Sequence, residues 1–328
     1  MGNKSSSSTA RSLDPPRKRN WLQDAASGAK SLGGQLRQQM NGGVDQLKAK
    51  LAFYPPEASY IFEEEPQLGA LQMWLIDPET RSKGVLAAAP GFSVFWLLKQ
   101  DSSSLGSSTL APSSLPAYIF EVPQARYTVL YSHSNGTDIG HMHELCRRLA
   151  TVLHVNVMAY EYTGYGCDSS TRRPSEPETY SDIRAALRFL VDTKAIPLHK
   201  IILYGQSIGS GPTIDLAAET SGLGGVVVHS GITSGMRVIQ PSVTITSYFD
   251  IFPNIDKIGR VQCPVLFIHG VSDGEVPIEH GIELHRGCPE AVSPLWIDGC
   301  GHNDIETVGR RAYIDKLEEF LKHLEAKG

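Results

Sequence analysis

A serine between two glycines stands where a predicted strand passes into a predicted helix. The residues Gly205-Gln206-Ser207-Ile208-Gly209 directly follow the apolar run 201–204, and a helical pattern continues to residue 218. A sharp strand-to-helix turn lifts a serine hydroxyl above the edge of a sheet, and small glycines permit the strained backbone of that turn. We therefore interpret Ser207 as the nucleophile of an acyl-transfer reaction rather than as a structural serine.

A serine hydroxyl needs a base to take its proton and an acid to orient that base. For a nucleophile in this kind of turn, the order along the chain is serine, then acid, then histidine. Asp273 and His302 each follow an apolar run that predicts a strand, and we assign them as acid and base. Asp298 and Asp304 are alternative acids, although Asp304 also suits a helix start. Glu275 is a weaker rival to Asp273.

Acyl transfer also needs hydrogen-bond donors that face the negative oxygen of the intermediate. The backbone N–H of Ile208, directly after the nucleophile, is the first candidate. The second is expected from the loop after the run 127–131, where the chain reads His133-Ser134-Asn135. The pattern does not decide between the Ser134 and Asn135 amides. It favours a structural role for His133.

These residues stand in loops between alternating strands and helices. Strands without polar alternation, separated by helices, are typical of an α/β fold with a mostly parallel central sheet and helices on both faces. Ligands of such sheets bind beyond the carboxyl ends of the strands, so we expect the three catalytic candidates to meet there. The predicted strands are 127–131, 155–160, 201–204, 225–229, 265–269 and 295–297, and the main predicted helices are 138–151, 176–191 and 305–324.

The chain before residue 117 has a less regular pattern. Residues 54–76 predict an entry turn and an early strand. Residues 77–116 are interpreted as an irregular, variable insertion, and the Ser-rich composition of 101–114 is typical of a mobile surface loop. The apolar stretch 85–98 predicts either a strand and a short helix of the body or an apolar loop that touches a membrane. Packing on the body is favoured.

Composition limits the class of protein. Of 328 residues, 41% are hydrophobic and 20% are charged, which is ordinary for a globular chain. No stretch reaches the roughly 18 apolar residues of a spanning helix, and the polar N-terminus carries no secretory signal. The 5 cysteines are widely spaced and odd in number, which disfavours a disulfide framework or a metal site. We expect thiols in a reducing compartment, and neither a metal nor a cofactor.

Residues 1–50 form a basic arm before the predicted catalytic body at 51–328. Residues 1–52 hold nine basic and three acidic side chains, a net charge of +6 in a chain whose total is −5. Gly2 with Ser6 fits the pattern for N-myristoylation, and an apolar stripe at helical spacing runs from Leu22 to Leu51. Lipid, charge and stripe together favour a membrane surface over a Ser-rich disordered tail, a helix packed on the body or a nucleic-acid contact.

Several longer motifs extend across the body. They are LAFYPP at 51–56, YSHSN at 131–135, YTGYG at 162–166, RPSE at 173–176, IILYGQSIG at 201–209, HSGITSGMR at 229–237, FDIFPNI at 249–255 and GHNDIE at 301–306. In these motifs the chain resembles the alpha/beta-hydrolase domain-containing protein 17 family, membrane-attached thioesterases that remove S-palmitoyl groups from proteins. The resemblance is dense over residues 117–325 and loose over 51–76. It implies an alpha/beta-hydrolase fold, with nucleophile, acid and base at Ser207, Asp273 and His302.

The chain departs from that family's pattern at three places. The family usually begins with a palmitoylated cysteine cluster, whereas the first cysteine here is Cys146, so Gly2 and the basic arm are expected to provide the anchor. Ser134 stands where the family usually has glycine. Residues 77–116 are longer and more Ser-rich than the family pattern.

The residues and the resemblance together predict a serine hydrolase that cleaves acyl thioesters, chiefly S-palmitoyl groups on membrane proteins. It is expected to be lipid-anchored and peripheral, on the cytoplasmic face of a membrane, with S-acylated proteins as partners and no nucleic acid. Met236, Phe249 and Phe252 are candidates for an acyl-chain groove, with ordinary lid packing as the alternative. A lipid esterase, such as a monoacylglycerol or lysophospholipid hydrolase, is the second interpretation. A non-catalytic interaction protein of the same fold is the third.

Overall fold

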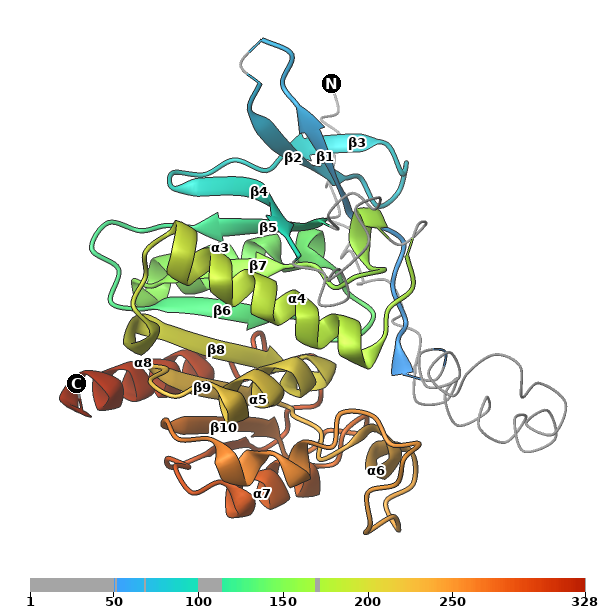
Figure 1. The fold of residues 1–328 in the computed structure, drawn as a ribbon, viewed down its shortest axis with the longest axis vertical. Coiled ribbons are helices and arrows are strands. Elements are labelled where there is room, and N and C mark those ends of the chain that lie inside the picture. The colour runs from blue at the N-terminus through green and yellow to red at the C-terminus, as the bar shows by residue number, and fades with distance from the viewer. Residues whose placement is uncertain (1–49, 51, 68, 100–113, 169–171, 328) are drawn as a thin grey trace, which may run out of the picture.

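An eight-stranded sheet runs through the protein (Figure 1). The structure, a computed structural model, describes residues 50, 52–67, 69–99, 114–168 and 172–327. The strand order is β11-β10-β9-β8-β6-β7-β5-β4, and all neighbours are parallel except at β5 and β4. The parallel strands are β6 (Thr128–Ser132), β7 (Asn156–Tyr160), β8 (Ile201–Gln206), β9 (Gly225–His229), β10 (Val265–Gly270) and β11 (Leu295–Ile297). The predicted parallel sheet is confirmed.

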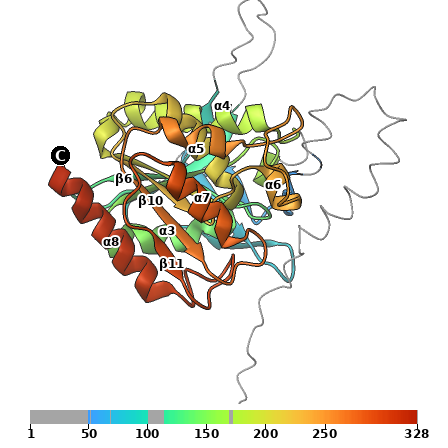
Figure 2. The same ribbon diagram turned by 90° about the horizontal axis from the view of Figure 1, so that it is seen from below.

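Both faces of this sheet are covered, which explains why its strands are apolar throughout. Successive side chains of a strand point to opposite faces, and in β8 Ile202 and Tyr204 join one buried cluster while Leu203 joins the other. Helices α3 (Ile139–Leu153) and α8 (Arg310–Lys327) cover one face, and α4 (Glu176–Arg188), α5 (Ser210–Glu219) and α7 (Ile278–Gly287) pack on the other (Figure 2). The expectation of helices on both faces is therefore also confirmed.

Polar caps mark where two of the covering helices begin. The Asp138 carboxylate accepts from the His141 N–H at the start of α3, and the Ser175 hydroxyl oxygen accepts from the Glu178 N–H at the start of α4. Such caps satisfy backbone donors that have no partner within the helix. Within the described residues, no helix is both long and apolar enough to cross a membrane.

The irregular interpretation of residues 77–116 is wrong where the structure describes them. Strand β3 (Lys83–Leu86) completes a small antiparallel sheet with β1 (Tyr60–Glu64) and β2 (Leu71–Ile76). Strand β4 (Phe92–Leu98) pairs over its whole length with β5 (Ser114–Phe120) at the edge of the large sheet. Residues 85–98 thus form strand and turn, without the expected short helix. The Ser-rich residues 100–113 lie outside the described part.

Two helix boundaries also differ from the prediction. The last helix begins at Arg310 rather than at residue 305, because the Asp304 carbonyl accepts from the Thr307 and Val308 amides and closes a turn instead. Helix α4 ends at Arg188, and a wider helical turn, Phe189–Thr193, follows it. The apolar spacing continues through both boundaries, so periodicity alone did not reveal them.

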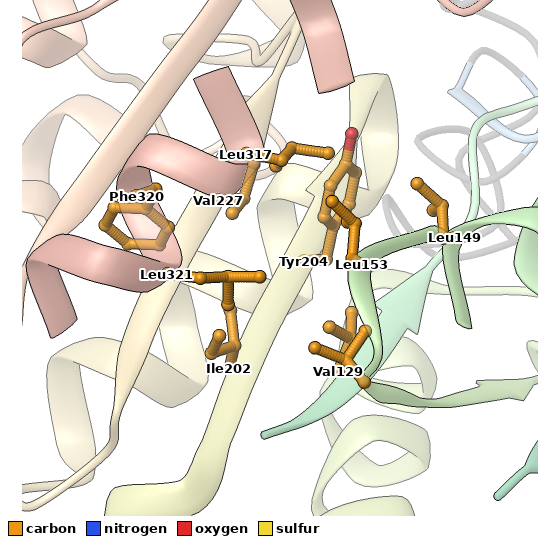
Figure 3. Close-up of a pocket in the computed structure, with 10 residues that line it drawn as sticks. Val129, Leu149, Leu153, Ile202, Tyr204, Val227, Leu317, Phe320 and Leu321 are labelled. Atoms are coloured by element: carbon orange, nitrogen blue, oxygen red, sulfur yellow. The ribbon is translucent and has the colours of Figure 1, made fainter. Parts of the chain in front are cut away.

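A small apolar cavity remains between the sheet and the pair α3 and α8 (Figure 3). Its volume is about 20 Å³. Side chains from three strands, both helices and the residue before β7 line it: Val129, Leu149, Leu153, Val155, Ile202, Tyr204, Val227, Leu317, Phe320 and Leu321. All of them belong to the buried cluster on this face, so the cavity is a packing gap in the core.

Truncating a side chain beside this cavity should destabilise the fold strongly. Leu321 is 3% exposed. Leu321→Ala is expected to lower the free energy of unfolding by about 2–5 kcal/mol, because the lost apolar contacts add to a void that already exists. Denaturant unfolding monitored by circular dichroism measures the change. Val152→Ala, at a position of α3 that is 51% exposed, is the control and should be nearly neutral. Equal effects of both substitutions would contradict this account of the core.

Candidate active site

The serine of the glycine-flanked motif occupies a strained turn at the carboxyl end of β8. Ser207 has φ of 55°, in the left-handed region that side chains other than glycine rarely adopt. The flanking glycines are required by space: a Cβ on Gly205 would lie 2.6 Å from the Gly209 carbonyl oxygen, and one on Gly209 would lie 2.3 Å from that of Ser132. The turn thus packs directly against the end of β6, as the nucleophile interpretation requires.

A continuous chain of hydrogen bonds joins the three predicted catalytic residues. His302 Nε2 lies 2.9 Å from Ser207 Oγ, and His302 Nδ1 lies 2.7 Å from Asp273 Oδ2. An ionised carboxylate only accepts, so it holds the proton on Nδ1 and leaves Nε2 free to accept from the serine hydroxyl. All three side chains are buried. The arrangement places a general base against a hydroxyl nucleophile.

Asp273 is held in its ionised form by several donors. Its Oδ1 accepts from the Glu275 and Val276 amides at 2.9 and 2.8 Å, and His269 Nε2 lies 3.3 Å from Oδ2. Burial by itself would raise the pKa of Asp273, but the hydrogen bonds from His269, His302 and the backbone outweigh it and hold the pKa well below its usual range. The carboxylate is therefore charged whenever it must orient His302.

The alternative acids have partners or positions other than His302. Asp304 Oδ1 accepts from the Gly301 amide at 2.8 Å and so shapes the turn that carries His302. Glu275 accepts from the Asn303 side chain, and Asp298 is exposed after β11. Among the described residues, Asp273 is the acid that bonds to His302. The role of helix cap expected for Asp304 is wrong, since α8 begins six residues later.

The candidate oxyanion donors lie in two loops that pack against each other. Within the described residues, the backbone N–H groups of Ser134 and Asn135 have no hydrogen-bond partner. The Ile208 N–H lies in the first turn of a helix, where N–H groups have no acceptor within the helix. The Asn135 side chain, in contrast, is fully engaged. It donates to the Ala52 carbonyl at 2.7 Å and accepts from the Tyr54 amide at 3.0 Å, much as a neighbouring strand would.

The segment that Asn135 holds is a contact that sequence analysis missed. Phe53 is buried, and its ring packs edge-on against the rings of Tyr165 and Phe252. The Tyr165 hydroxyl also donates to Asn135 Oδ1, at 2.7 Å. The point where the chain enters the body is thereby tied to the candidate oxyanion loop. The available sequence signal was Phe53, shortly before two prolines. A residue type does not show which side chains it will contact.

The three groove candidates have different surroundings. Phe249 is 55% exposed and Met236, on the short helix α6 (Gly235–Ile239), is half-buried. Phe252 is completely buried, and a Cβ on Gly211 would lie 2.2 Å from its ring. The ring of Phe252 fills the space that this glycine leaves on α5, so its assignment to an open groove is wrong. Hydrophobic type alone did not separate a core ring from a surface ring.

Two expectations concern a metal and the N-terminal arm. The described residues contain no group of three or more histidine, cysteine or acidic side chains arranged to hold a metal ion. Gly2 and the apolar stripe of the arm lie outside the described residues, so the proposed lipid anchor stays a prediction from the sequence.

The chain is similar to known proteins in sequence and in fold. No family model matches the chain. Alpha/beta hydrolase domain-containing protein 17C of Xenopus tropicalis is 38% identical over 296 residues, which is 85% of this chain and 90% of that protein. Alpha/beta hydrolase domain-containing protein aho-3 of Caenorhabditis elegans is also 38% identical, over 84% of this chain and 77% of that protein. An esterase of Pyrococcus furiosus shares the fold at 15% identity, with a TM-score of 0.56 over 71% of this chain and 92% of that chain.

Exchange of the acid should test the assignment of Asp273. Asp273→Asn is expected to lower kcat about 10⁴-fold, because an amide in this place stabilises the wrong tautomer of His302. Steady-state hydrolysis of a soluble p-nitrophenyl ester measures the loss. Asp298→Asn is the control and should retain activity. A comparable loss in Asp298→Asn or Asp304→Asn, with Asp273→Asn unaffected, would assign the acid differently.

Proposed function

Because the chain belongs to the alpha/beta hydrolase domain-containing protein 17 family, we propose that it is a serine hydrolase that cleaves acyl thioesters, chiefly S-palmitoyl groups on membrane-attached proteins. The fold and the relatives make it a hydrolase. The serine mechanism and the thioester substrate are our proposal. The observation that carries it is the unbroken hydrogen-bond chain from Ser207 through His302 to Asp273.

The geometry supports acylation of the serine as the first step. Ser207 Oγ attacks the thioester carbonyl carbon while His302 Nε2 takes the hydroxyl proton, and Asp273 stabilises the imidazolium that forms. The carbonyl oxygen becomes negative, and the Ile208 amide with one from the 134–135 loop would donate to it. Collapse of this intermediate breaks the carbon–sulfur bond. The thiolate leaves with the proton from His302, and the acyl group stays on Ser207.

Water completes the reaction by the same route in reverse. His302 takes a proton from water, the hydroxide attacks the acyl-serine carbonyl carbon, and the second intermediate collapses to free fatty acid. The proton on His302 returns to Ser207 Oγ. No metal or cofactor enters either step, and each proton that leaves an oxygen or reaches a sulfur passes through one imidazole nitrogen.

Apolar side chains near α6 support a long acyl chain as the substrate. Figure 1 places α6 at the end of the sheet where β8 delivers Ser207. On the segment that follows α6, Ile245, Tyr248 and Phe249 are 80%, 75% and 55% exposed. Exposed apolar side chains that gather on one segment mark contact with an apolar partner. Phe249 and Met236 are our candidates for contact with the acyl chain.

The basic arm supports a membrane as the place of action. One myristoyl chain at Gly2 would bind a membrane only marginally, and the basic residues would add electrostatic attraction to anionic lipids. Enzyme and S-acylated protein would then share one surface. We propose attachment to the cytoplasmic face through the arm, with the catalytic body held against the membrane.

Removal of the nucleophile should test the reaction itself. Ser207→Ala is expected to lose labelling by a fluorophosphonate probe and to lower kcat by up to about 10⁶-fold on palmitoyl-cysteine peptides, because no other side chain can form the acyl intermediate. Ser293→Ala, at an exposed position, is the control. Turnover equal to that of the unmodified chain in Ser207→Ala would exclude the serine mechanism. A higher kcat/KM on monoacylglycerol than on the thioester would favour the lipid esterase.

Loss of the acylation site should test the membrane anchor. Gly2→Ala is expected to move much of the protein from the membrane fraction to the soluble fraction of expressing cells, because the basic patch is weak alone. Activity on soluble esters should persist, since no catalytic candidate lies in the arm. Ser8→Ala, outside the acylation pattern, is the control and should stay with membranes. Unchanged partition of Gly2→Ala would assign the anchor to another segment or a partner.

A further inference from the structure

A buried histidine and a buried glutamate adjoin the loop that carries the candidate oxyanion amides. His133 follows β6, Glu161 follows the neighbouring parallel strand β7, and neither side chain is exposed. His133 Nε2 lies 2.8 Å from Glu161 Oε1. The catalytic chain of Ser207, His302 and Asp273 uses neither residue. Placing an acid in the interior is costly unless it is paired, so this pair needs a role of its own.

The hydrogen-bond partners of the pair determine where its protons lie. His133 Nδ1 lies 2.9 Å from the Ser134 carbonyl oxygen, which can only accept, so Nδ1 carries a hydrogen. The Glu161 carboxyl group is surrounded by hydrogen-bond donors. His133 Nε2 faces Glu161 Oε1, so both ring nitrogens of His133 lie against acceptor oxygens. The other donors to Glu161 are the Tyr162 amide and Tyr60 hydroxyl, both at 3.1 Å, and the Ile139 amide at 3.2 Å.

The aromatic surroundings fit a cationic ring. The Tyr162 ring lies 4.0 Å from the His133 ring, measured between centroids, with 31° between their planes. The Tyr165 ring lies 5.6 Å away on the same measure. The face of a tyrosine ring attracts a cation at such distances, and the attraction is stronger where water is excluded.

These contacts hold two consecutive peptide groups. The Tyr162 hydroxyl donates to the His133 carbonyl oxygen at 2.7 Å, and the His133 Nδ1–H donates to the Ser134 carbonyl oxygen. The C=O and N–H of a trans peptide point in opposite directions. With both oxygens turned toward Tyr162 and the His133 ring, the N–H groups of Ser134 and Asn135 are directed away from them. Those are the two amides that the sequence offered as the second oxyanion donor.

We propose that His133, as an imidazolium paired with Glu161, is a positioning residue of the oxyanion hole. A neutral histidine would have to give up either its hydrogen bond to Ser134 or its hydrogen bond to the carboxylate. The charged ring keeps both, so the 134–135 peptide cannot turn without leaving the buried Nδ1–H of His133 without its acceptor. Donors fixed in advance stabilise the transition state without reorganising during the reaction. The inference rests on the proposed serine hydrolase function.

The protonation of His133 can be measured in the full chain. With ¹⁵N-labelled histidine, both ring nitrogens of His133 are expected to be protonated at pH 7, and His133→Gln assigns the signals by their loss. A neutral His133 ring at pH 7 would overturn the proposal. This measurement needs no substrate, so it does not depend on the activity of the chain.

Kinetics test the effect on the oxyanion hole. Glu161→Gln keeps the size of the side chain but removes its charge. It is expected to lower kcat about 10²-fold with KM nearly unchanged, because oxyanion donors act mainly in the transition state. His143→Gln is the matched control: His143 is a buried histidine of α3 that packs among Phe92, Tyr118 and Phe120, and its substitution should leave kcat unchanged. A kcat equal to that of the unmodified chain in folded Glu161→Gln would also overturn the proposal.

Failure of the proposed function has a different signature. In that case the unmodified full chain would hydrolyse neither thioesters nor oxyesters, although its His133 signals would still report the charge of the ring. Failure of the positioning role requires an active unmodified chain and either a neutral His133 or a Glu161→Gln variant that turns over normally. The activity of the unmodified chain therefore distinguishes the two outcomes.

Discussion

The hydrogen bond between Ser207 and His302 joins residues 95 positions apart. The fold must therefore hold two distant loops at a fixed distance from each other. A donor and acceptor at 2.9 Å lose most of their interaction if either loop moves by an ångström. Flexible loops alone would not hold that distance against their conformational entropy. The three loops leave the carboxyl ends of the parallel strands β8, β10 and β11, so the edge of one sheet fixes all their starting points.

Buried polar groups near that edge link the loops to each other by hydrogen bonds. Gln206, next to the nucleophile, accepts from the Tyr131 hydroxyl at 2.8 Å and donates to Glu306 at 3.0 Å, which ties the serine turn to the loop of His302. The Tyr204 hydroxyl lies 2.8 Å from His229 Nδ1. Burial lowers the pKa of His229 to about 4, so this ring stays neutral near pH 7. The interior beside the catalytic residues thus provides hydrogen bonds without an unpaired charge.

The edge of the sheet beyond β7 is antiparallel, unlike the parallel core. Strands β5 and β4 run antiparallel there, and β4 lies within the range 77–116 for which the sequence predicts an irregular insertion. An edge strand is buried on one side and exposed along the other, as the 44% exposure of Trp96 and the 1% exposure of Leu97 illustrate. Its residues therefore satisfy two environments at once, which weakens the signal that sequence periodicity carries.

The sequence by itself determined the parallel core, and it singled out Ser207, His302 and a short set of candidate acids led by Asp273. Short continuous apolar runs between helices are typical of buried strands. The glycines around Ser207 are required locally, because a side chain there would clash with neighbouring backbone. Tertiary structure alone decided which acid faces His302, that Phe252 fills the core beside Gly211, and that His133 pairs with Glu161. Each of these depends on the distance between residues far apart in the chain. A local pattern records the type of a side chain, whereas only packing assigns its partner.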